Sequence, residues 1–179
     1  MSRFGAIVLL LAFLASGCAS DERRAPRSGA FGYRFDDGFD TSRATIALPI
    51  FVNNTFSTGL EIDLAAAVAA EVDRATPWAI TDEQAADGVL RGVIAYASIR
   101  PLATGRGTGY VSEVAYQITV DFEYVDNRTG EVIVGRRGFS ASGTWIAARS
   151  VGERIEVGQL AAVERLAHDM VAELRSDWE

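Results

Sequence analysis

Hydrophobic and polar side chains alternate most regularly between Val114 and Tyr124. The apolar positions are Val114, Tyr116, Ile118, Val120, Phe122 and Tyr124, and most residues between them are polar. A period of two predicts a β-strand with one face in the core and the other polar. Turn-forming residues occupy 126–130, so we expect residues 131–145 to return as the hairpin partner of this strand.

Two further stretches have the composition of strands. Residues 44–52 are rich in β-branched and apolar side chains, but Pro49 lacks an N–H donor, which favours an edge strand or a bulge. Residues 89–99 lead into the glycine-rich stretch 104–109. Because a strand and not a helix follows these glycines, they indicate a hairpin loop and not a dinucleotide-binding turn.

The spacing of the remaining apolar residues predicts two helices. Leu60, Leu64, Val68 and Val72 form one stripe, which Thr58 and Glu61 would begin as a capping box and Pro77 would end. A longer helix begins near Ile155. Its apolar stripe consists of Leu160, Val163, Ala167, Met170, Val171, Leu174 and Trp178.

The order of these elements is β-α-β-β-β-α. It predicts an α+β protein, a two-layer sandwich in which a four-stranded mixed sheet carries two helices on one face. We expect a single domain over residues 31–179, since no internal repeat is visible.

The N-terminal residues have the pattern of a lipoprotein signal. Residues 1–17 contain Arg3, a short apolar run and the small residues Ala15, Ser16 and Gly17, directly before the only cysteine, Cys18. The stretch from Leu14 to Cys18 resembles the bacterial lipobox, which implies lipidation of Cys18. Residues 18–30 then read as a flexible tether, and acyl chains would anchor the protein to a membrane. The alternative is a plain signal peptide with a cysteine near its cleavage site.

Composition and charge narrow the possible partners. The formal net charge is −7 and all 17 basic residues are arginines, so general nucleic-acid binding is not expected. With one histidine and one cysteine the chain offers little material for a zinc site, and no metal or other cofactor is predicted.

Candidate catalytic groups are few, and the sequence favours a protein that is not an enzyme. His168 lies opposite the apolar stripe of its helix, which indicates a surface histidine more than a general base. Asp121 and Glu123 share the polar face of their strand and would serve acid–base chemistry only within a cleft. No activated nucleophile is apparent.

Four arginines are candidates for binding phosphate or carboxylate groups of a ligand or protein partner. They are Arg100 and Arg106 near the glycine-rich stretch, and Arg136 and Arg137 on the last strand. Guanidinium groups bind phosphate and carboxylate oxygens in a bidentate manner. The alternative is ordinary surface charge in a protein without lysine.

The assembled pattern resembles the lipopolysaccharide-assembly lipoprotein family called LptE. The resemblance rests on Cys18, on the glycine-aromatic stretch 32–35, on the Tyr116-Gln117 strand and on the run from Ile46 to Glu61. The element order agrees over residues 31–179. The glycine-aromatic stretch lies well after Cys18, whereas in the family it follows the lipidated cysteine directly.

This resemblance implies a non-catalytic role. Such a protein would be anchored in the cell outer membrane, face the periplasm, and act as a plug or chaperone within a large β-barrel of the LptD type that inserts lipopolysaccharide. The alternative is a periplasm-facing lipoprotein of similar fold that activates a cell-wall synthase or forms part of a secretion pore.

Overall fold

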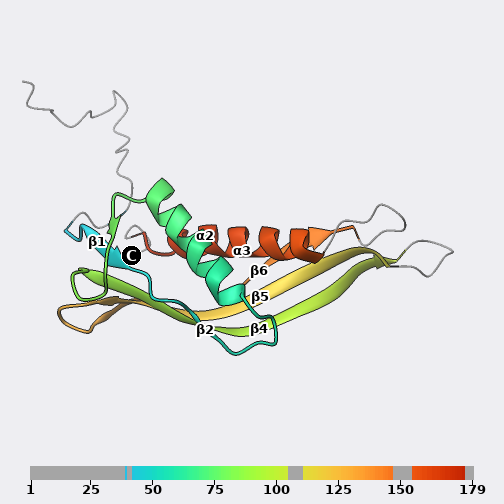
Figure 1. Ribbon diagram of the computed structural model, residues 1–179, viewed down its shortest axis with the longest axis horizontal. Helices are drawn as coiled ribbons and strands as arrows, with labels where there is room; N and C mark the ends of the chain where they lie inside the picture. The colour runs from blue at the N-terminus through green and yellow to red at the C-terminus, as the bar shows by residue number, and fades with distance from the viewer. Residues whose placement is uncertain (1–38, 40–41, 105–110, 147–154, 176–179) are drawn as a thin grey trace, which may run out of the picture. The chain divides into compact units, whose positions relative to one another are not determined.

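The computed structural model describes residue 39 and residues 42–104, 111–146 and 155–175, which belong to one compact unit spanning Asp36–Glu179. The elements in chain order are β1 (Thr45–Ala47), β2 (Val52–Asn53), α2 (Leu60–Ala75), β3 (Ala79–Ile80), β4 (Gly88–Thr104), β5 (Val111–Asp126), β6 (Val132–Trp145) and α3 (Ile155–Ala172). Figure 1 shows long strands beneath two helices that lie on the same side of the sheet. The predicted α+β class is therefore confirmed.

The sheet has six strands, so the prediction of four was wrong. The stretch predicted as one strand is divided into β1 and β2, which pair in parallel with β4 at Ile46↔Gly88 and Val52↔Val93. The chain from Ile46 to Val52 is one residue longer than the part of β4 from Gly88 to Val93 with which it pairs. Pro49 lies in the gap between β1 and β2. Phe51 turns inward there, beneath Gly92, where an added Cβ would lie 2.7 Å from the phenyl ring.

The two-residue strand β3 was also missed, because it follows Pro77 and has no periodicity to reveal it. Strand β3 lies at one edge of the sheet, in which the strands are arranged in the order β3-β1-β4-β5-β6. Strand β2 also pairs with β4 but is not part of this order. Strand β1 is parallel to both of its neighbours, β3 and β4. Strands β4, β5 and β6 form an antiparallel meander, which confirms the predicted hairpin partner.

The predicted period of two in β5 corresponds to its burial. All six apolar positions from Val114 to Tyr124 are buried beneath the helices. Helix α2 buries Leu60, Leu64, Val68 and Val72. Helix α3 buries Gly158, Ala162, Val163, Leu166, Ala167, Met170 and Val171.

Helix α3 approaches β6 closely at a pair of glycines. A Cβ on Gly143 would lie 2.5 Å from the backbone nitrogen of Ala162 and would also clash with the carbonyl oxygen of Gly158. A Cβ on Gly158 would in turn clash with the ring of Trp145. The lack of side chains at these two positions therefore sets the distance between helix and sheet.

The start of α2 differs from the predicted capping box. Its N-cap is Gly59, which has a φ of 86° and makes no side-chain capping bond. Glu61 instead accepts a hydrogen bond from Asn53 Nδ2 at 2.6 Å. The asparagine also accepts bonds from the backbone N–H and the hydroxyl of Thr55, so it organises the turn before the helix.

The predicted stripe on α3 is largely buried, but Leu160 is 57 % exposed. Trp178, Cys18, Arg106 and the glycines at 105–109 lie outside the described residues. Among the described helices, none combines the length and apolar character that a bilayer-spanning segment requires.

Candidate functional site

The candidate site lies on the open face, which we define as the side of β4, β5 and β6 opposite α2 and α3. No described helix covers this face (Figure 1). Its central positions on β5 and β6 carry small or neutral polar side chains, and cross-strand pairs such as Gln117↔Ser142 and Thr119↔Ser140 lie side by side. The structure thus confirms that one face of β5 is core and the other polar.

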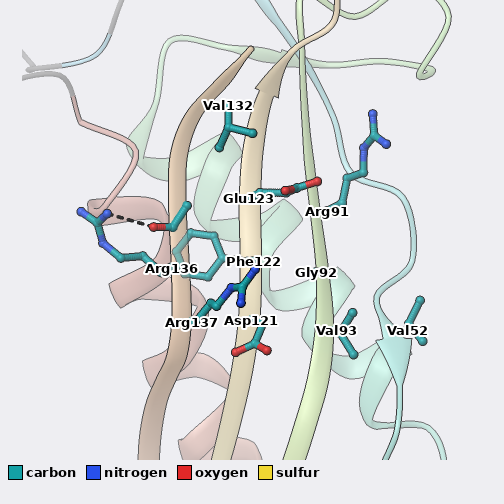
Figure 2. A pocket seen from close by; sticks show the side chains of 11 residues that line it. Val52, Arg91, Gly92, Val93, Asp121, Phe122, Glu123, Val132, Arg136 and Arg137 are labelled. Atoms are coloured by element: carbon teal, nitrogen blue, oxygen red, sulfur yellow. Dashed lines mark hydrogen bonds between the residues drawn. The ribbon is translucent and has the colours of Figure 1, made fainter. Parts of the chain in front are cut away.

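A hollow of about 720 Å³ occupies one end of the open face. Figure 2 looks onto it, with the helices behind the strands. Strands β2, β4, β5 and β6 all contribute to it. Its lining consists of Val52, Arg91, Gly92, Val93, Asp121, Phe122, Glu123, Val132, Gly135, Arg136 and Arg137.

A β-bulge positions the charged groups of this hollow. The β5–β6 register shifts between the pairs Val120↔Phe139 and Phe122↔Arg136, so Asp121 faces an extra residue on β6. Gly138 takes a φ of 64° at the bulge, and its N–H donates to Asp121 Oδ1 at 2.7 Å. Bulges redirect the side chains next to them. This bulge is where Arg137 projects onto the open face, as Figure 2 shows.

The two neighbouring arginines have different surroundings. The Nε of Arg136 lies 2.7 Å from Glu173 Oε2, just beyond α3, and its Nη1 donates to the carbonyl oxygen of Gly135. Arg136 therefore ties the edge strand to the helical layer. Arg137 is exposed and lines the hollow, and no ion pair joins it to another described residue.

Strand pairing adds an arginine that the sequence analysis did not single out. Arg91 on β4 pairs with Glu123 on β5, which pairs with Gly135 on β6, so three distant segments meet at the hollow. Arg91 makes one long contact of 3.9 Å with Glu83, and both side chains are about half exposed. An exposed pair at this distance contributes little, so the guanidinium is available to a ligand.

The other predicted site residues lie elsewhere. Arg100 is exposed on β4 opposite Ala115, seven β5 positions from the partner of Arg136. At about 3.3 Å per residue this places it roughly 23 Å along the sheet from the hollow. His168 is on the helical layer, where its Nδ1 lies 2.8 Å from Glu71 Oε1.

The hollow is suited to binding an amphiphile with an anionic group. Arg91 and Arg137 can each offer a planar fork of donors to phosphate oxygens. Val52, Val93 and Val132 supply apolar surface beside them. Asp121 and Glu123 share this site, but the Gly138 N–H already engages Asp121, and no group of three or more potential metal ligands occurs among the described residues.

Several solved structures resemble this chain. The hypothetical protein CT253 from Chlamydia trachomatis has a TM-score of 0.52 at 10% identity, over 73% of this chain and 94% of that one. A PelC dodecamer subunit from Paraburkholderia phytofirmans has a TM-score of 0.49 at 18% identity, over 76% and 92%. The lipoprotein GNA1162 from Neisseria meningitidis has a TM-score of 0.45 at 14% identity, over 72% and 98%. At these identities the likeness concerns the fold alone.

No curated protein sequence matches the chain. The family model described as LptE, lipopolysaccharide-assembly, matches residues 43–177, which include every element from β1 to α3. This is a family of lipoproteins of the cell envelope. The chain belongs to the LptE lipopolysaccharide-assembly family.

Proposed function

We propose that this chain is an outer-membrane lipoprotein that partners a large β-barrel of the LptD type and helps it insert lipopolysaccharide. Its role would be that of a non-catalytic plug or chaperone. Family membership supports a part in lipopolysaccharide assembly. The anchor would be acyl chains on Cys18, which would hold the domain at the periplasmic side of the membrane.

The observation that carries the proposal is the open face. A plug within a barrel lumen needs a surface that pairs with polar side chains, because the interior of a large outer-membrane barrel is polar. Strands β5 and β6 present Gln117, Thr119, Ser140, Ser142 and Thr144 there. Ordinary edge strands carry charges that discourage contact, whereas residues 139–145 of β6 carry none.

The hollow would hold the anionic part of the glycolipid at the rim of this surface. Arg137 is the leading contact residue, with Arg91 beside it. Arg100, farther along β4, remains a candidate for a second contact, as does Arg106, which lies outside the described residues. Arg136 has a weaker case as a ligand, since its guanidinium is engaged by Glu173 and Gly135.

Affinity purification tests the barrel partnership directly. C-terminally tagged protein would be recovered from detergent-solubilised envelopes, and we expect a large β-barrel in a one-to-one ratio by mass spectrometry. The double variant Ser140→Trp/Ser142→Trp, which obstructs the open face, should lose the barrel. Gln84→Trp, on an exposed turn, should retain it.

Two other outcomes would replace the proposal. Recovery of a cell-wall synthase would move the protein to the class of synthase activators. Recovery of the protein alone as a large ring-shaped particle in light scattering would point to a secretion-pore subunit.

A further inference from the structure

A second surface lies on the other side of the molecule, in a groove between α2 and α3. Its volume is about 690 Å³. The groove is separate from the open face, because both helices turn their buried stripes toward the sheet. Its lining consists of Asp63, Ala66, Ala67, Ala70, Glu71, Arg74, Glu156, Gln159, Leu160, Val163 and Glu164.

The floor of the groove is apolar and has little side-chain bulk. On α2 it is formed by alanines, with Ala66 and Ala70 one turn apart and both exposed. Residues four apart lie on one helical stripe, so this stripe would let another backbone approach closely. Leu160 of α3 stands beside it, 57 % exposed, and Ile62 precedes Ala66 on the same stripe, 61 % exposed. Leu160 thus lines the groove beside the alanines, and Ile62 extends the apolar stripe of α2 one turn before Ala66, outside the groove lining.

The rim of the groove is acidic. Four carboxylates and a single guanidinium, that of Arg74, line the groove. Arg74 Nη2 lies 2.5 Å from Glu71 Oε1. A hydrogen bond with Arg74, and a weaker one with His168, lower the pKa of Glu71. This carboxylate is therefore ionised, and Arg74 already balances its charge. In the described part of the chain, no cationic side chain pairs with Asp63, Glu156 or Glu164. Asp63 Oδ2 accepts a long hydrogen bond from the side-chain amide of Gln159, at 3.5 Å.

The apolar floor and the acidic rim of the groove together favour one kind of binding partner. A second copy would bring the same acidic rim, and an anionic bilayer surface would be repelled as well. A groove between two helices with a small-residue floor accepts a third helix, whose apolar side chains enter the groove. The acidic rim requires that the flanks of this helix be basic.

We propose that the α2–α3 groove is a docking site for a cationic amphipathic helix of a partner protein. The aliphatic side chains of that helix contact Leu160, Ile62 and the alanine floor. Its arginine or lysine side chains pair with Asp63, Glu156 and Glu164. The protein then engages partners from two opposite surfaces, through the open face of the sheet and through the helical layer.

Synthetic peptides test this site on the tagged full chain. The probe is a fluorescent 16-residue Leu/Arg peptide of amphipathic helical pattern, and fluorescence anisotropy gives its Kd. Matched peptides are a Leu/Glu peptide of the same pattern and a Leu/Arg peptide with its pattern scrambled. We expect binding of the first alone, weakening several-fold between 50 and 500 mM NaCl because of screening.

Variants then locate the binding. Glu156→Gln/Glu164→Gln should raise the Kd about three- to tenfold, since each exposed ion pair contributes modestly. Ala66→Arg, which blocks the floor, should raise it at least tenfold. Glu113→Gln/Glu131→Gln removes the same charge at exposed positions away from the groove and should leave the Kd unchanged. Circular dichroism confirms that each variant is folded.

Three results would overturn the proposal. They are failure of the amphipathic Leu/Arg peptide to bind, equal binding of the scrambled peptide, and equal loss in the Glu113→Gln/Glu131→Gln control. The last result would mean that net charge alone attracts the peptide.

Discussion

Arg43 and Asp126, 83 residues apart in sequence, form an ion pair in which Arg43 Nη2 lies 3.1 Å from Asp126 Oδ2. The other carboxylate oxygen accepts the backbone N–H groups of Arg128 and Thr129. One buried carboxylate thus joins the residues before β1 to the β5–β6 turn. The fold is fastened at the end of the sheet where β1, β4 and β5 begin or end.

This arrangement predicts a pH dependence of stability. The N–H groups of Thr129 and Arg128, and then the Arg43 guanidinium, lower the pKa of Asp126 from 3.8 to about 2. Because the folded state favours the ionised form, its stabilising contribution is complete above the unfolded pKa and is lost as pH falls from about 4 to about 2.

Urea denaturation across this pH range provides the measurement. Asp126→Asn should unfold at lower urea than the wild type at pH 5–7, and the two midpoints should converge between about pH 4 and pH 2. Asp73→Asn, on the exposed side of α2, serves as the control. A midpoint difference that stayed constant down to pH 2 would show that the carboxylate charge does not matter.

The glycine contact between β6 and α3 predicts a specific intolerance. Gly143→Ala would place a methyl group against Gly158 and Ala162, and overpacking of this kind costs about 1–3 kcal/mol. Gly135→Ala on the same strand is the matched control, because the nearest side-chain atom to its Cβ lies 3.5 Å away. The free energy of unfolding should fall for the first variant only. Equal stability of the two would mean that α3 can shift without cost.

The hydroxyl of Tyr116 fixes the turn before α2. Its oxygen lies 2.8 Å from Ser57 Oγ, and this bond ties the β2–α2 connection to β5. We expect Tyr116→Phe to lower the free energy of unfolding by about 1 kcal/mol, the usual contribution of one such bond. Tyr96→Phe, at an exposed position, should have no effect. A double-mutant cycle with Ser57→Ala should yield most of this energy as coupling; additive effects would argue against the bond.

The hollow on the open face predicts a division of roles between neighbouring arginines. Arg137→Ala should weaken binding of purified lipopolysaccharide about tenfold, as expected for one charge-assisted contact, without changing stability. Arg136→Ala should chiefly lower stability, since it removes the contact with Glu173. Arg128→Ala, in an exposed turn, is the control for lost positive charge. Unchanged lipopolysaccharide binding in Arg137→Ala would remove the hollow as a glycolipid site.

The mass of the N-terminal peptide tests whether the protein carries a lipid anchor. We expect the N-terminal peptide of the envelope-derived protein to begin at Cys18 and to carry acyl chains. Cys18→Ala should abolish acylation and release the domain from the membrane fraction. An unmodified Cys18 on the mature protein would restore the alternative of a plain signal peptide.

Much of the fold could be predicted because its larger elements have strong periodicity. Strand β5 alternates along its length, and the buried stripe of α2 recurs at helical spacing, so local pattern and burial agree. The short strands β1, β2 and β3 have two or three residues each, too few to show a period. They exist because neighbouring strands supply their hydrogen bonds, and that information is not local.

The candidate site was predictable only in part for a similar reason. Arg136 and Arg137 stood out as a pair in the sequence, but the bulge at Gly138, which separates their roles, depends on the register with Asp121. Arg91 reaches the same hollow only through the pairing of β4 with β5. Likewise, the sequence did not reveal that Gly59 would be the N-cap of α2, or that the preceding turn would bring the amide of Asn53 to Glu61.

The placement of β1 between β3 and β4 has a mechanical consequence. With an acyl anchor at Cys18, any pull between membrane and domain enters the fold from the N-terminal side. Phe39 is the first described residue that such a force would reach. Its ring packs edge-on against that of Trp78, with 5.2 Å between the ring centroids. The force would next act on Arg43 and on β1, and β1 is hydrogen-bonded to β3 on one side and to β4 on the other. Strand β1, where such a tether would lead into the fold, lies inside the sheet, so tension on the tether would act on several hydrogen bonds at once instead of peeling away an edge strand.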